Sequence, residues 1–425
     1  MNGPVSRYGI RRVGPGGRIR RGHWPPIDLT RRQLLRGVGA AGAVAATGSL
    51  LACGTEPAGP SADPMGTDSP TPAPEAVDRS DEEPVLTFDN WPLYIDSDDD
   101  DANIRPTLQA FEEETGIRVT YVEAINDNDE YFARISPQLS AGQPIGADVF
   151  VVTDWLVARL IRLGWLQQLD HDNMPNVIAN IDPALANPGF DPGRMFSVPW
   201  QSGLSGIGYN SNEIPDGVHS FEQLLTDDRL HGRVALWSSM HESLPMLANA
   251  FGTSFEEMSE DGVAQAIAAV EEAVASGQIR RFTGNEYVAE LASGDLVACM
   301  AWSGDIMQMQ LEDEAAVEFV IPEEGGELWS DNLCVPAGAT HKKNAELLMN
   351  HYYQPEIAAE LAAWVWFISP VPAAKEAMAE IDPDLVDEWM IFPAPEDLAN
   401  TGITRELTPE EEESWTAEWN TVVGA

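Results

Sequence analysis

Basic side chains are scarce in this chain of 425 residues. It holds 24 lysines and arginines against 69 aspartates and glutamates, for a formal net charge of −45, and only three residues are lysine. Nucleic acids and anionic membranes need basic patches, so the imbalance argues against both as partners. The charge is compatible with attracting cations. An acid-rich, lysine-poor surface is also typical of a salt-tolerant protein, which we take as the better explanation of the bulk charge.

Cysteine and the common catalytic motifs are scarce as well. The three cysteines are Cys53, Cys299 and Cys334. The last two lie in apolar strand contexts, which favours buried free thiols and leaves a disulfide between them open. The sequence contains no glycine-rich phosphate loop, no Cys/His metal cluster and no nucleophile elbow. We therefore expect no metal, no cofactor and no enzymatic activity.

Long apolar runs are missing too, even near the N-terminus. Nine of the basic residues, all arginine, fall within residues 7–36, and Arg31-Arg32 precedes a Gly/Ala-rich run over 37–52. That run is too short and too weakly apolar to span a membrane. The pattern resembles a twin-arginine export signal ending in a lipobox at Cys53. We expect residues 1–52 to be a removed signal peptide and Cys53 to carry lipid, which anchors the protein to the membrane.

Residues 53–83 are predicted to be a flexible tether, because they are rich in Pro, Thr, Ser, Ala, Gly and acids. The pattern changes at Pro84, and the remaining length allows two domains with ample cores. Strands and helices then alternate along the chain. The expected order is strand 85–88, helix 104–115, strand 117–122, helix 131–141 and strand 148–152. This alternation predicts an α/β fold in which a parallel sheet carries helices on both faces.

Tryptophan and carboxylate residues recur together after predicted strands. Trp302 and Asp305 follow an apolar strand, and Trp329 and Asp331 follow another, where we expect a loop. An indole face attracts a cation by roughly 0.5–2 kcal/mol. A carboxylate adds a charge-assisted hydrogen bond to an ammonium N–H. Each pair therefore suits an organic cation.

Two further clusters have the same character, one at 90–94 and one at Thr153-Asp154-Trp155. Ligands of open α/β sheets bind where strands end, so we expect these clusters to converge on one cleft that holds a polyvalent amine. The alternative is structural. Tryptophan is usually a core residue, and 13 of them in so acidic a chain will lie near acids by chance.

Three other patterns are weaker. The acidic run 96–101 is similar to a calcium loop but lacks the turn glycine and the closing Glu, so helix capping and solvated charge are expected. His241 and Glu242 could be an acid/base pair, but neighbours on a loop rarely face one atom. We expect His241 to be a hydrogen-bonded loop residue. The small residues of 201–206 suit a passage between lobes, with strands 196–199 and 206–210 on either side.

In this order, the motifs resemble the bacterial spermidine/putrescine-binding proteins, the extracytoplasmic solute receptors of polyamine ABC transporters. The resemblance covers about residues 84–425, and its carriers are 90–94, 198–201, 207–210, 301–305 and 322–333. It implies a type II periplasmic-binding-protein-like fold, with the ligand in a cleft between two α/β lobes. The implied lobes are 84–203 with 328–376, and 204–327 with 377–425.

The resemblance also implies a role for particular residues. It assigns the cleft wall to Trp91, Tyr94, Trp329 and Phe367, ammonium pairing to Glu242, Asp305 and Asp331, methylene stacking to Trp302, and a Ser/Tyr pair of the family to Thr153 and Trp155. Two departures stand out. Ser239 replaces an acid of the spermidine binders, and Asp154 adds an acid near Thr153. Asp305 is typical of putrescine-type members and favours a diamine-like arrangement.

The resemblance predicts a lipid-anchored, monomeric receptor on the outer side of the cell membrane. It would bind a polyamine and deliver it to the permease subunits of an ABC transporter. Other readings stay open: a receptor for a quaternary amine, an amino acid or a sugar, a glycosidase that uses Glu242 and Asp305 as its carboxylate pair, or a surface lipoprotein without a ligand.

Overall fold

The computed structural model describes residues 76–98, 101, 103–313 and 316–424. The predicted signal peptide, the lipidation site Cys53 and most of the predicted tether lie outside these residues. Within them the strands are β1 (Val85–Asn90), β2 (Arg118–Glu123), β3 (Val149–Thr153), β4 (Ser197–Asn210), β5 (Val234–Trp237), β6 (Ile279–Thr283), β7 (Ala298–Trp302), β8 (Val317–Val320), β9 (Gly326–Cys334) and β10 (Thr401–Gly402). In this part of the chain they form one sheet in the order β2-β1-β3-β9-β4-β7-β5-β6, with β8 paired to β4 and β10 to β9.

The first lobe contains the predicted alternation of strands and helices. Strand β1 pairs in parallel with both β2 and β3. The helices of this lobe are α2 (Pro106–Thr115), α3 (Asn128–Ser140), α4 (Asp154–Arg162), α5 (Pro175–Asn180), α11 (Lys342–Tyr352), α12 (Pro355–Val365) and α13 (Ala374–Ile381). Phe88, Phe111 and Leu348 are fully buried between sheet and helices. The fold class predicted from the sequence is therefore confirmed.

The second lobe has its own hydrophobic core. Its helices are α6 (Phe221–Thr226), α7 (Met240–Ala250), α8 (Glu260–Ser276), α9 (Tyr287–Ser293), α10 (Ser303–Asp313) and α14 (Pro409–Val423). Strands β5 and β6 are parallel, as are β5 and β7. Trp415 and Trp419 of α14 pack into this core, although α14 is the last helix in sequence. Residues from two distant parts of the chain thus build the second lobe.

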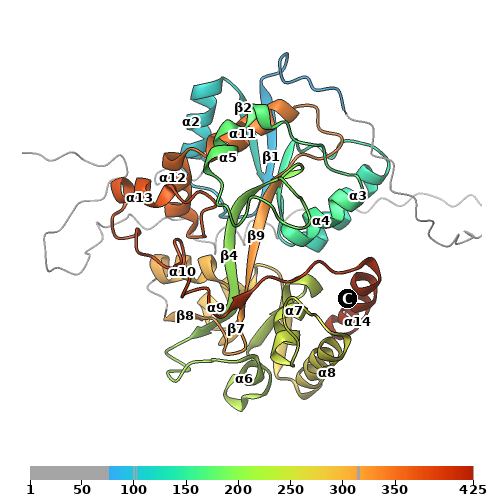
Figure 1. Ribbon diagram of the computed structural model, residues 1–425. Helices are drawn as coiled ribbons and strands as arrows, with labels where there is room; N and C mark the ends of the chain where they lie inside the picture. Colours follow the sequence, from blue (N-terminus) through green and yellow to red (C-terminus); the bar gives the residue numbers. More distant parts are fainter. Residues whose placement is uncertain (1–75, 99–100, 102, 314–315, 425) are drawn as a thin grey trace, which may run out of the picture. The chain divides into compact units, whose positions relative to one another are not determined.

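Two long antiparallel strands, β4 and β9, run side by side between the lobes (Figure 1). The sequence predicted two strands around a glycine-rich crossing, but β4 is one strand of 14 residues with an irregularity between Pro199 and Gln201. The small residues of β4 allow neighbouring side chains to pack closely against the strand. A Cβ on Gly203 would lie 2.4 Å from the Trp329 ring on β9, so a larger residue would displace that indole.

Two features differ from the predicted boundaries. Residues just before β1 contact the start of α11: Asp78 accepts a hydrogen bond from the backbone N–H of Lys343, and Ser80 accepts one from that of Asn344. Near the other boundary, Met378, Leu385 and Ile391 pack with the first-lobe core, though the sequence placed residues from 377 onward in the second lobe. These are capping and packing contacts between distant segments, which composition does not reveal.

Cys299 on β7 and Cys334 on β9 are both buried free thiols, which resolves the alternative left open by the sequence. Among the described residues, no three His, Cys, Asp or Glu side chains cluster as metal ligands would. The same part of the chain has no helix with the length and apolar character needed to span a membrane. Asp96, in the acidic run, accepts hydrogen bonds from the backbone and side chain of Thr107 at the start of α2.

Candidate ligand-binding cleft

A cavity of about 50 Å³ lies where elements of both lobes meet. All the ligand-binding residues expected from the sequence, except Asp154 and Trp155, line it. The lining residues are Trp91, Pro92, Leu93, Tyr94, Asn128, Thr153, Glu242, Asn285, Trp302, Asp305, Trp329, Asp331 and Phe367. Five of these side chains are aromatic and three are carboxylic acids, and none is basic.

Most of these residues lie on regular elements and not on loops. Trp329 and Asp331 were expected in a loop, but they lie within β9, where residues two apart share one face of the strand. Asp305 is in the first turn of α10, and Glu242 is in the first turn of α7. Side chains on strands and helices are held more rigidly than side chains on loops.

The loop after β1 presents Trp91 and Tyr94 to the cleft. Trp91 donates its indole N–H to the Val151 carbonyl at 3.1 Å, and the Tyr94 carbonyl accepts the Trp200 indole N–H at 3.2 Å. Leu93 lies between them with φ of 56°, a left-handed conformation that costs a non-glycine residue of order 1–3 kcal/mol. Anchors on both sides therefore hold a strained turn in place at the cavity.

Phe367 and Trp329 form the adjoining wall. Their ring centroids lie 5.6 Å apart, and the Tyr94 ring meets Phe367 edge-on at 5.2 Å. Phe367 follows Trp366, whose φ of 60° ends α12 and turns the chain toward the cleft. A Cβ on Gly304 would come within 2.5 Å of the Phe367 ring, so glycine at the start of α10 allows this ring to approach.

Trp302 connects the cores of the two lobes. Its ring stacks on Trp237 of the second lobe at 4.8 Å and meets Trp91 of the first lobe edge-on at 6.4 Å. It is partly buried against the hydrophobic clusters of both lobes. With Trp91 and the other aromatic lining residues, Trp302 gives the cavity a large apolar surface with negative π faces, which suits an alkyl chain bearing positive charge.

Neutral donors hold the Asp305 carboxylate where it lines the cavity. Oδ2 of Asp305 accepts hydrogen bonds from the Tyr287 hydroxyl at 2.8 Å and from the Asn285 amide at 2.9 Å. The Tyr287 oxygen in turn accepts the backbone N–H of Trp302 at 3.0 Å. This acid is therefore oriented by a hydrogen-bonded chain before any ligand arrives. We call this region the Asp305 end.

A second group of lining residues joins two acids through neutral side chains. Thr153 donates its hydroxyl to Asp331 Oδ1 at 2.7 Å and accepts the Asn128 amide at 2.8 Å. The same Asn128 nitrogen lies 3.4 Å from Oε1 of Glu242, which also accepts the Trp155 indole N–H at 3.4 Å. We call this region the Asp331 end. It brings two carboxylic acids to one side of the cavity.

Burial makes ionisation difficult at the Asp331 end. It raises the pKa of Asp331 to about 7, although hydrogen bonds from Thr153 lower it. Burial and the nearby acids Glu327 and Asp331 raise the pKa of Glu242 well above its ordinary value. Glu327 is also buried, which raises its pKa to about 7. A cationic ligand would supply the positive charge that lets these groups ionise. The buried Tyr94 hydroxyl lies near Asp331 and, together with Thr153, helps to lower the pKa of that carboxyl.

Asp154 and Trp155 lie outside the cavity lining. Asp154 begins α4, and its carboxylate accepts the Asn332 amide at 2.7 Å. Asn332 also accepts a hydrogen bond from the buried Arg194. Burial raises the pKa of Asp154 to about 6 despite the Arg194 charge. Because residues of a helical turn diverge, Asp154 and Trp155 cannot follow Thr153 into the cavity. Trp155 reaches the site only through Glu242.

Sequence reasoning missed Asn128, Asn285, Tyr287 and Glu327. Asn285 had a detectable signal, because it follows β6 just as the expected residues follow their strands. Asn128 stands beside the helix cap Asp127, which explained the local pattern without a ligand. Tyr287 resembles an ordinary core residue of α9. Glu327 belongs to an acidic stretch, which gives no sign in the sequence that this residue is buried. In the folded protein it is buried, and Thr404 donates a hydrogen bond to its carboxyl group.

As expected, His241 and Glu242 share no hydrogen-bond partner among the described residues, but they lie in α7 and not in a loop. The His241 ring faces Glu412, while Glu242 faces the cavity. Arg405, which would oppose a cationic ligand, does not line the cavity. Its guanidinium binds Glu411 through contacts of 2.7 and 2.8 Å.

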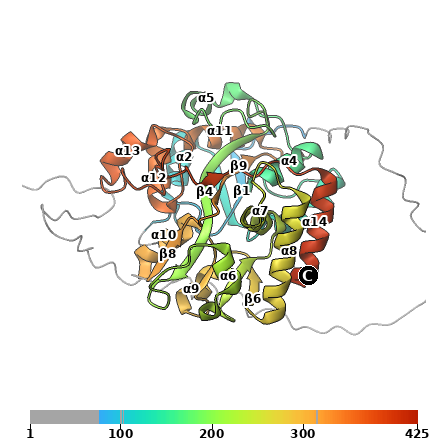
Figure 2. The same ribbon diagram turned by 60° about the horizontal axis from the view of Figure 1, so that its bottom comes forward.

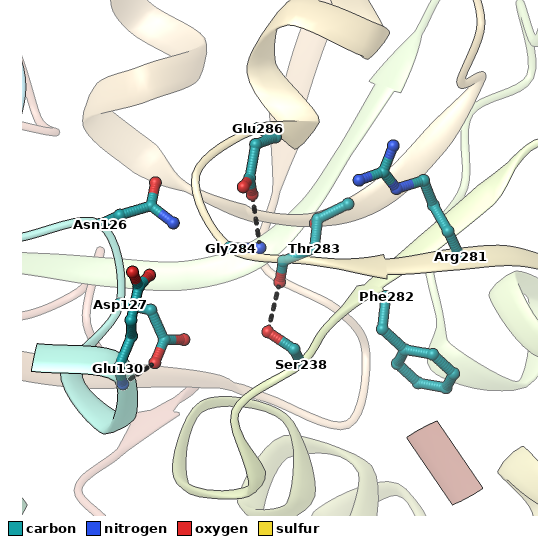
Figure 3. A pocket seen from close by; sticks show the side chains of 9 residues that line it. All are labelled: Asn126, Asp127, Glu130, Ser238, Arg281, Phe282, Thr283, Gly284 and Glu286. Atoms are coloured by element: carbon teal, nitrogen blue, oxygen red, sulfur yellow. Dashed lines mark hydrogen bonds between the residues drawn. The ribbon is translucent and has the colours of Figure 1, made fainter. Parts of the chain in front are cut away.

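A second cavity, of about 270 Å³, lies near the first (Figure 3). Asn126 and Asp127 border it from before α3, Thr283 from the end of β6, and Gly284 and Glu286 from the residues after β6. In Figure 3 the Arg281 and Phe282 side chains lie on the opposite side of the view from Asp127. This larger cavity differs from the smaller one in having a single aromatic ring, Phe282, and a basic side chain, Arg281, among its lining residues.

The cavity is lined by residues of both lobes, and these are mainly aromatic rings, carboxylic acids and amides. Fold and site together define a two-lobed solute-binding receptor. The model of the family described as bacterial extracellular solute-binding protein matches residues 107–393. The chain belongs to this family, whose members bind solutes and are not enzymes, so the expected absence of catalysis is confirmed and the glycosidase alternative is excluded.

Individual relatives agree with the family. The spermidine/putrescine-binding periplasmic protein of Escherichia coli strain K12 is 24% identical over 323 residues, or 76% of this chain and 87% of that protein. The putrescine-binding periplasmic protein SpuD of Pseudomonas aeruginosa is 26% identical over 357 residues, 80% of this chain and 91% of that protein. The structure of the TpPotD lipoprotein of Treponema pallidum has the same fold, with a TM-score of 0.66 at 23% identity over 80% of this chain and 100% of that one. The family resemblance inferred from the sequence is confirmed.

Proposed function

We propose that this protein is an extracytoplasmic receptor that binds a short polyamine, putrescine or spermidine, and delivers it to the permease subunits of an ABC transporter. The observation that carries the proposal is the composition of the cleft: five aromatic rings and three carboxylic acids, with no basic side chain among its lining residues. The names of the relatives support the same class of ligand. A receptor for a neutral sugar would not need three acids in so small a space.

Each end of the cleft would bind one ammonium group of the ligand. Asp305 would bind one ammonium group, and Asp331 with Glu242 would bind the other. The methylene chain would lie between Trp302 and a wall of Trp91, Tyr94, Trp329 and Phe367. Charge-assisted hydrogen bonds and cation–π contacts are both stronger where water is excluded. Acids at two ends, with an apolar middle, favour a diamine over a single quaternary ammonium.

The remaining predicted residues would support this site. Thr153 holds Asp331, while Trp155 holds Glu242. Asp154 would act on Asp331 only through its charge, since its own carboxylate is engaged by Asn332. Closure of the lobes over the ligand would exclude water and strengthen each ion pair, so a polyamine would favour the closed form.

We further propose that the mature protein is a monomer, anchored by lipid on Cys53 at the outer face of the cell membrane and tethered by the residues that follow. The lobes would comprise 84–203 with 328–392, and 204–327 with 393–425. The second boundary is moved from residue 376 because apolar residues between Ala377 and Phe392 pack with the first-lobe core. A Cys53→Ala variant that still incorporates labelled fatty acid would refute the anchor.

Calorimetry with putrescine, spermidine, spermine, betaine and maltose tests the ligand class. We expect micromolar or tighter binding of at least one polyamine, with no heat from betaine or maltose. Binding of betaine alone would indicate a quaternary-amine receptor, and binding of maltose alone would indicate a sugar receptor. Either result would overturn the polyamine assignment while leaving the solute-binding fold intact.

A further inference from the structure

The C-terminal helix α14 belongs to the core of the second lobe but reaches the first. Trp419 donates its indole N–H to the Ser238 carbonyl at 2.8 Å, and Trp415 packs into the same core. Figures 1 and 2 show α14 lying along α8 of the second lobe. At its start, Glu412 faces α4 of the first lobe.

Glu412 gathers partners from both lobes. Its carboxylate lies 2.7 Å from Arg159 and 2.9 Å from Arg162, both on α4. Oε1 also accepts a hydrogen bond of 3.2 Å from Nε2 of His241 on α7. Burial alone would raise the pKa of Glu412, but the His241 hydrogen bond and the Arg159 charge outweigh it and lower the pKa to about 2. A mostly buried carboxylate with three such donors is worth more than an exposed ion pair.

The same cluster touches the binding site through stacked rings. The His241 ring lies parallel to the Trp155 ring at 3.6 Å, with 3° between their planes. Arg159 lies over Trp155 as well, 5.2 Å from the ring centroid. Trp155 then donates to Glu242, which lines the cavity. One chain of contacts therefore runs from the C-terminal helix, across both lobes, to a carboxylic acid of the cleft.

The geometry points to α14 as a clasp: Glu412 binds α4 and α7 at once, holds the lobes closed, and keeps Trp155 where it orients Glu242. The Glu412 contacts to the first lobe exist only while the lobes are together, so they favour the closed state without contacting the ligand. His241 and Trp155 are positioning residues in this arrangement. The use of the clasp to retain a polyamine rests on the proposed function, whereas the clasp itself does not.

The test compares Glu412→Gln with Glu413→Gln, a matched change at the exposed neighbouring residue of the same helix. In the ligand-free protein, hydrogen exchange is followed in peptides covering 153–163 and 238–247, with 266–276 of α8 as an internal reference. We expect exchange in the first two peptides to be about tenfold faster in Glu412→Gln, because this variant loses the charge-assisted hydrogen bonds of Glu412. We expect no change in Glu413→Gln or in the reference peptide.

A second readout tests the link to the ligand. Putrescine should dissociate about tenfold faster from Glu412→Gln than from Glu413→Gln. Arg162→Gln, which removes one arm of the cluster, replaces Glu412→Gln if that variant does not fold, with a smaller expected change. Equal exchange in the Glu412 and Glu413 variants would overturn the clasp. If putrescine binds no version of the protein, the proposed ligand fails, and the exchange result still decides the clasp.

Discussion

The two ends of the cleft hold their buried carboxylic acids in different ways. At the Asp305 end, one carboxylate is held by two neutral donors, Tyr287 and Asn285. At the Asp331 end, two carboxylic acids share a chain of neutral residues, and burial raises the pKa of both Asp331 and Glu242. Neutral donors orient the acid at the first end. The other end needs positive charge from the ligand before both of its acids can ionise.

This difference predicts that the two ends have different roles in ligand binding. The Asp305 end should set the geometry in which an ammonium group is accepted, because its acid is already oriented. The Asp331 end should couple binding to protonation, because a bound cation stabilises the ionised acids. Variants at the two ends should therefore differ in more than the size of their effect on affinity.

Asp331→Asn should give the largest effect. The amide keeps the shape but removes the charge, so putrescine affinity should fall more than tenfold, which is at least about 1.4 kcal/mol. At pH 8 the ligand-free variant should melt at a higher temperature than the wild type, because a buried charge without a partner is gone. Calorimetry and thermal unfolding measure the two quantities, with Asp384→Asn as an exposed control. Unchanged affinity would remove Asp331 from the site.

Lowering the pH from 8 to 5.5 should weaken putrescine binding about tenfold. The pKa of Asp331 is raised to about 7, so its carboxyl is mostly protonated at pH 5.5 and must lose a proton when the cation binds. The stability of the ligand-free protein changes with pH in the opposite direction. Because the pKa of Asp331 is raised, its protonated form stabilises the folded protein at low pH, and this stabilisation is lost as the pH rises through 7. Titrations at pH 6.5 in buffers of different ionisation heat should reveal released protons. A flat profile between pH 8 and 5.5 would contradict the assignment.

The alternation of strands and helices and most of the cleft residues could be predicted from the sequence, because both leave local signals in it. Trp302 and Trp329, for example, are large aromatic residues placed beside acids at strand positions. Residues whose role depends on long-range contacts left no such signal. Tyr287 orients Asp305 across 18 positions, and Glu412 contacts Arg159 across 253. Pairings at this separation are decided by the packing of whole elements, which composition and periodicity do not encode.

Local context also misled in identifiable ways. Asp154 stands between two residues assigned to the site, but the start of α4 turns its side chain toward Asn332. Trp329 and Asp331 follow glycine-rich sequence, yet they pair with β4 as part of a strand. In both cases the hydrogen bonding of the backbone, and not the identity of the side chain, decided the outcome.

Tyr287→Phe tests the Asp305 end alone. Losing one hydrogen bond to the carboxylate should weaken putrescine binding about three- to fivefold, since a neutral donor contributes roughly 0.5–1.5 kcal/mol. The change in affinity between pH 8 and 5.5 should stay as in the wild type, because Asp331 and Glu242 are untouched. A Tyr287→Phe protein with a flattened pH profile would show that the two ends are not independent.

Ser239→Asp should have the smallest effect and tests the first departure from the spermidine binders. Restoring an acid at this position would increase spermidine affinity if the family arrangement applied. Here the Ser239 hydroxyl donates to Asp129 at 2.8 Å, so a second carboxylate would repel Asp129 across the lobes. We expect about twofold weaker spermidine binding in calorimetry. The double variant Ser239→Asp with Asp129→Asn should recover at least the wild-type affinity, because the repulsion is then removed and the new acid can serve a cation. A single Ser239→Asp change that strengthens spermidine binding would mean that Asp129 moves aside, and that the cleft accepts a third ammonium group beyond the two ends.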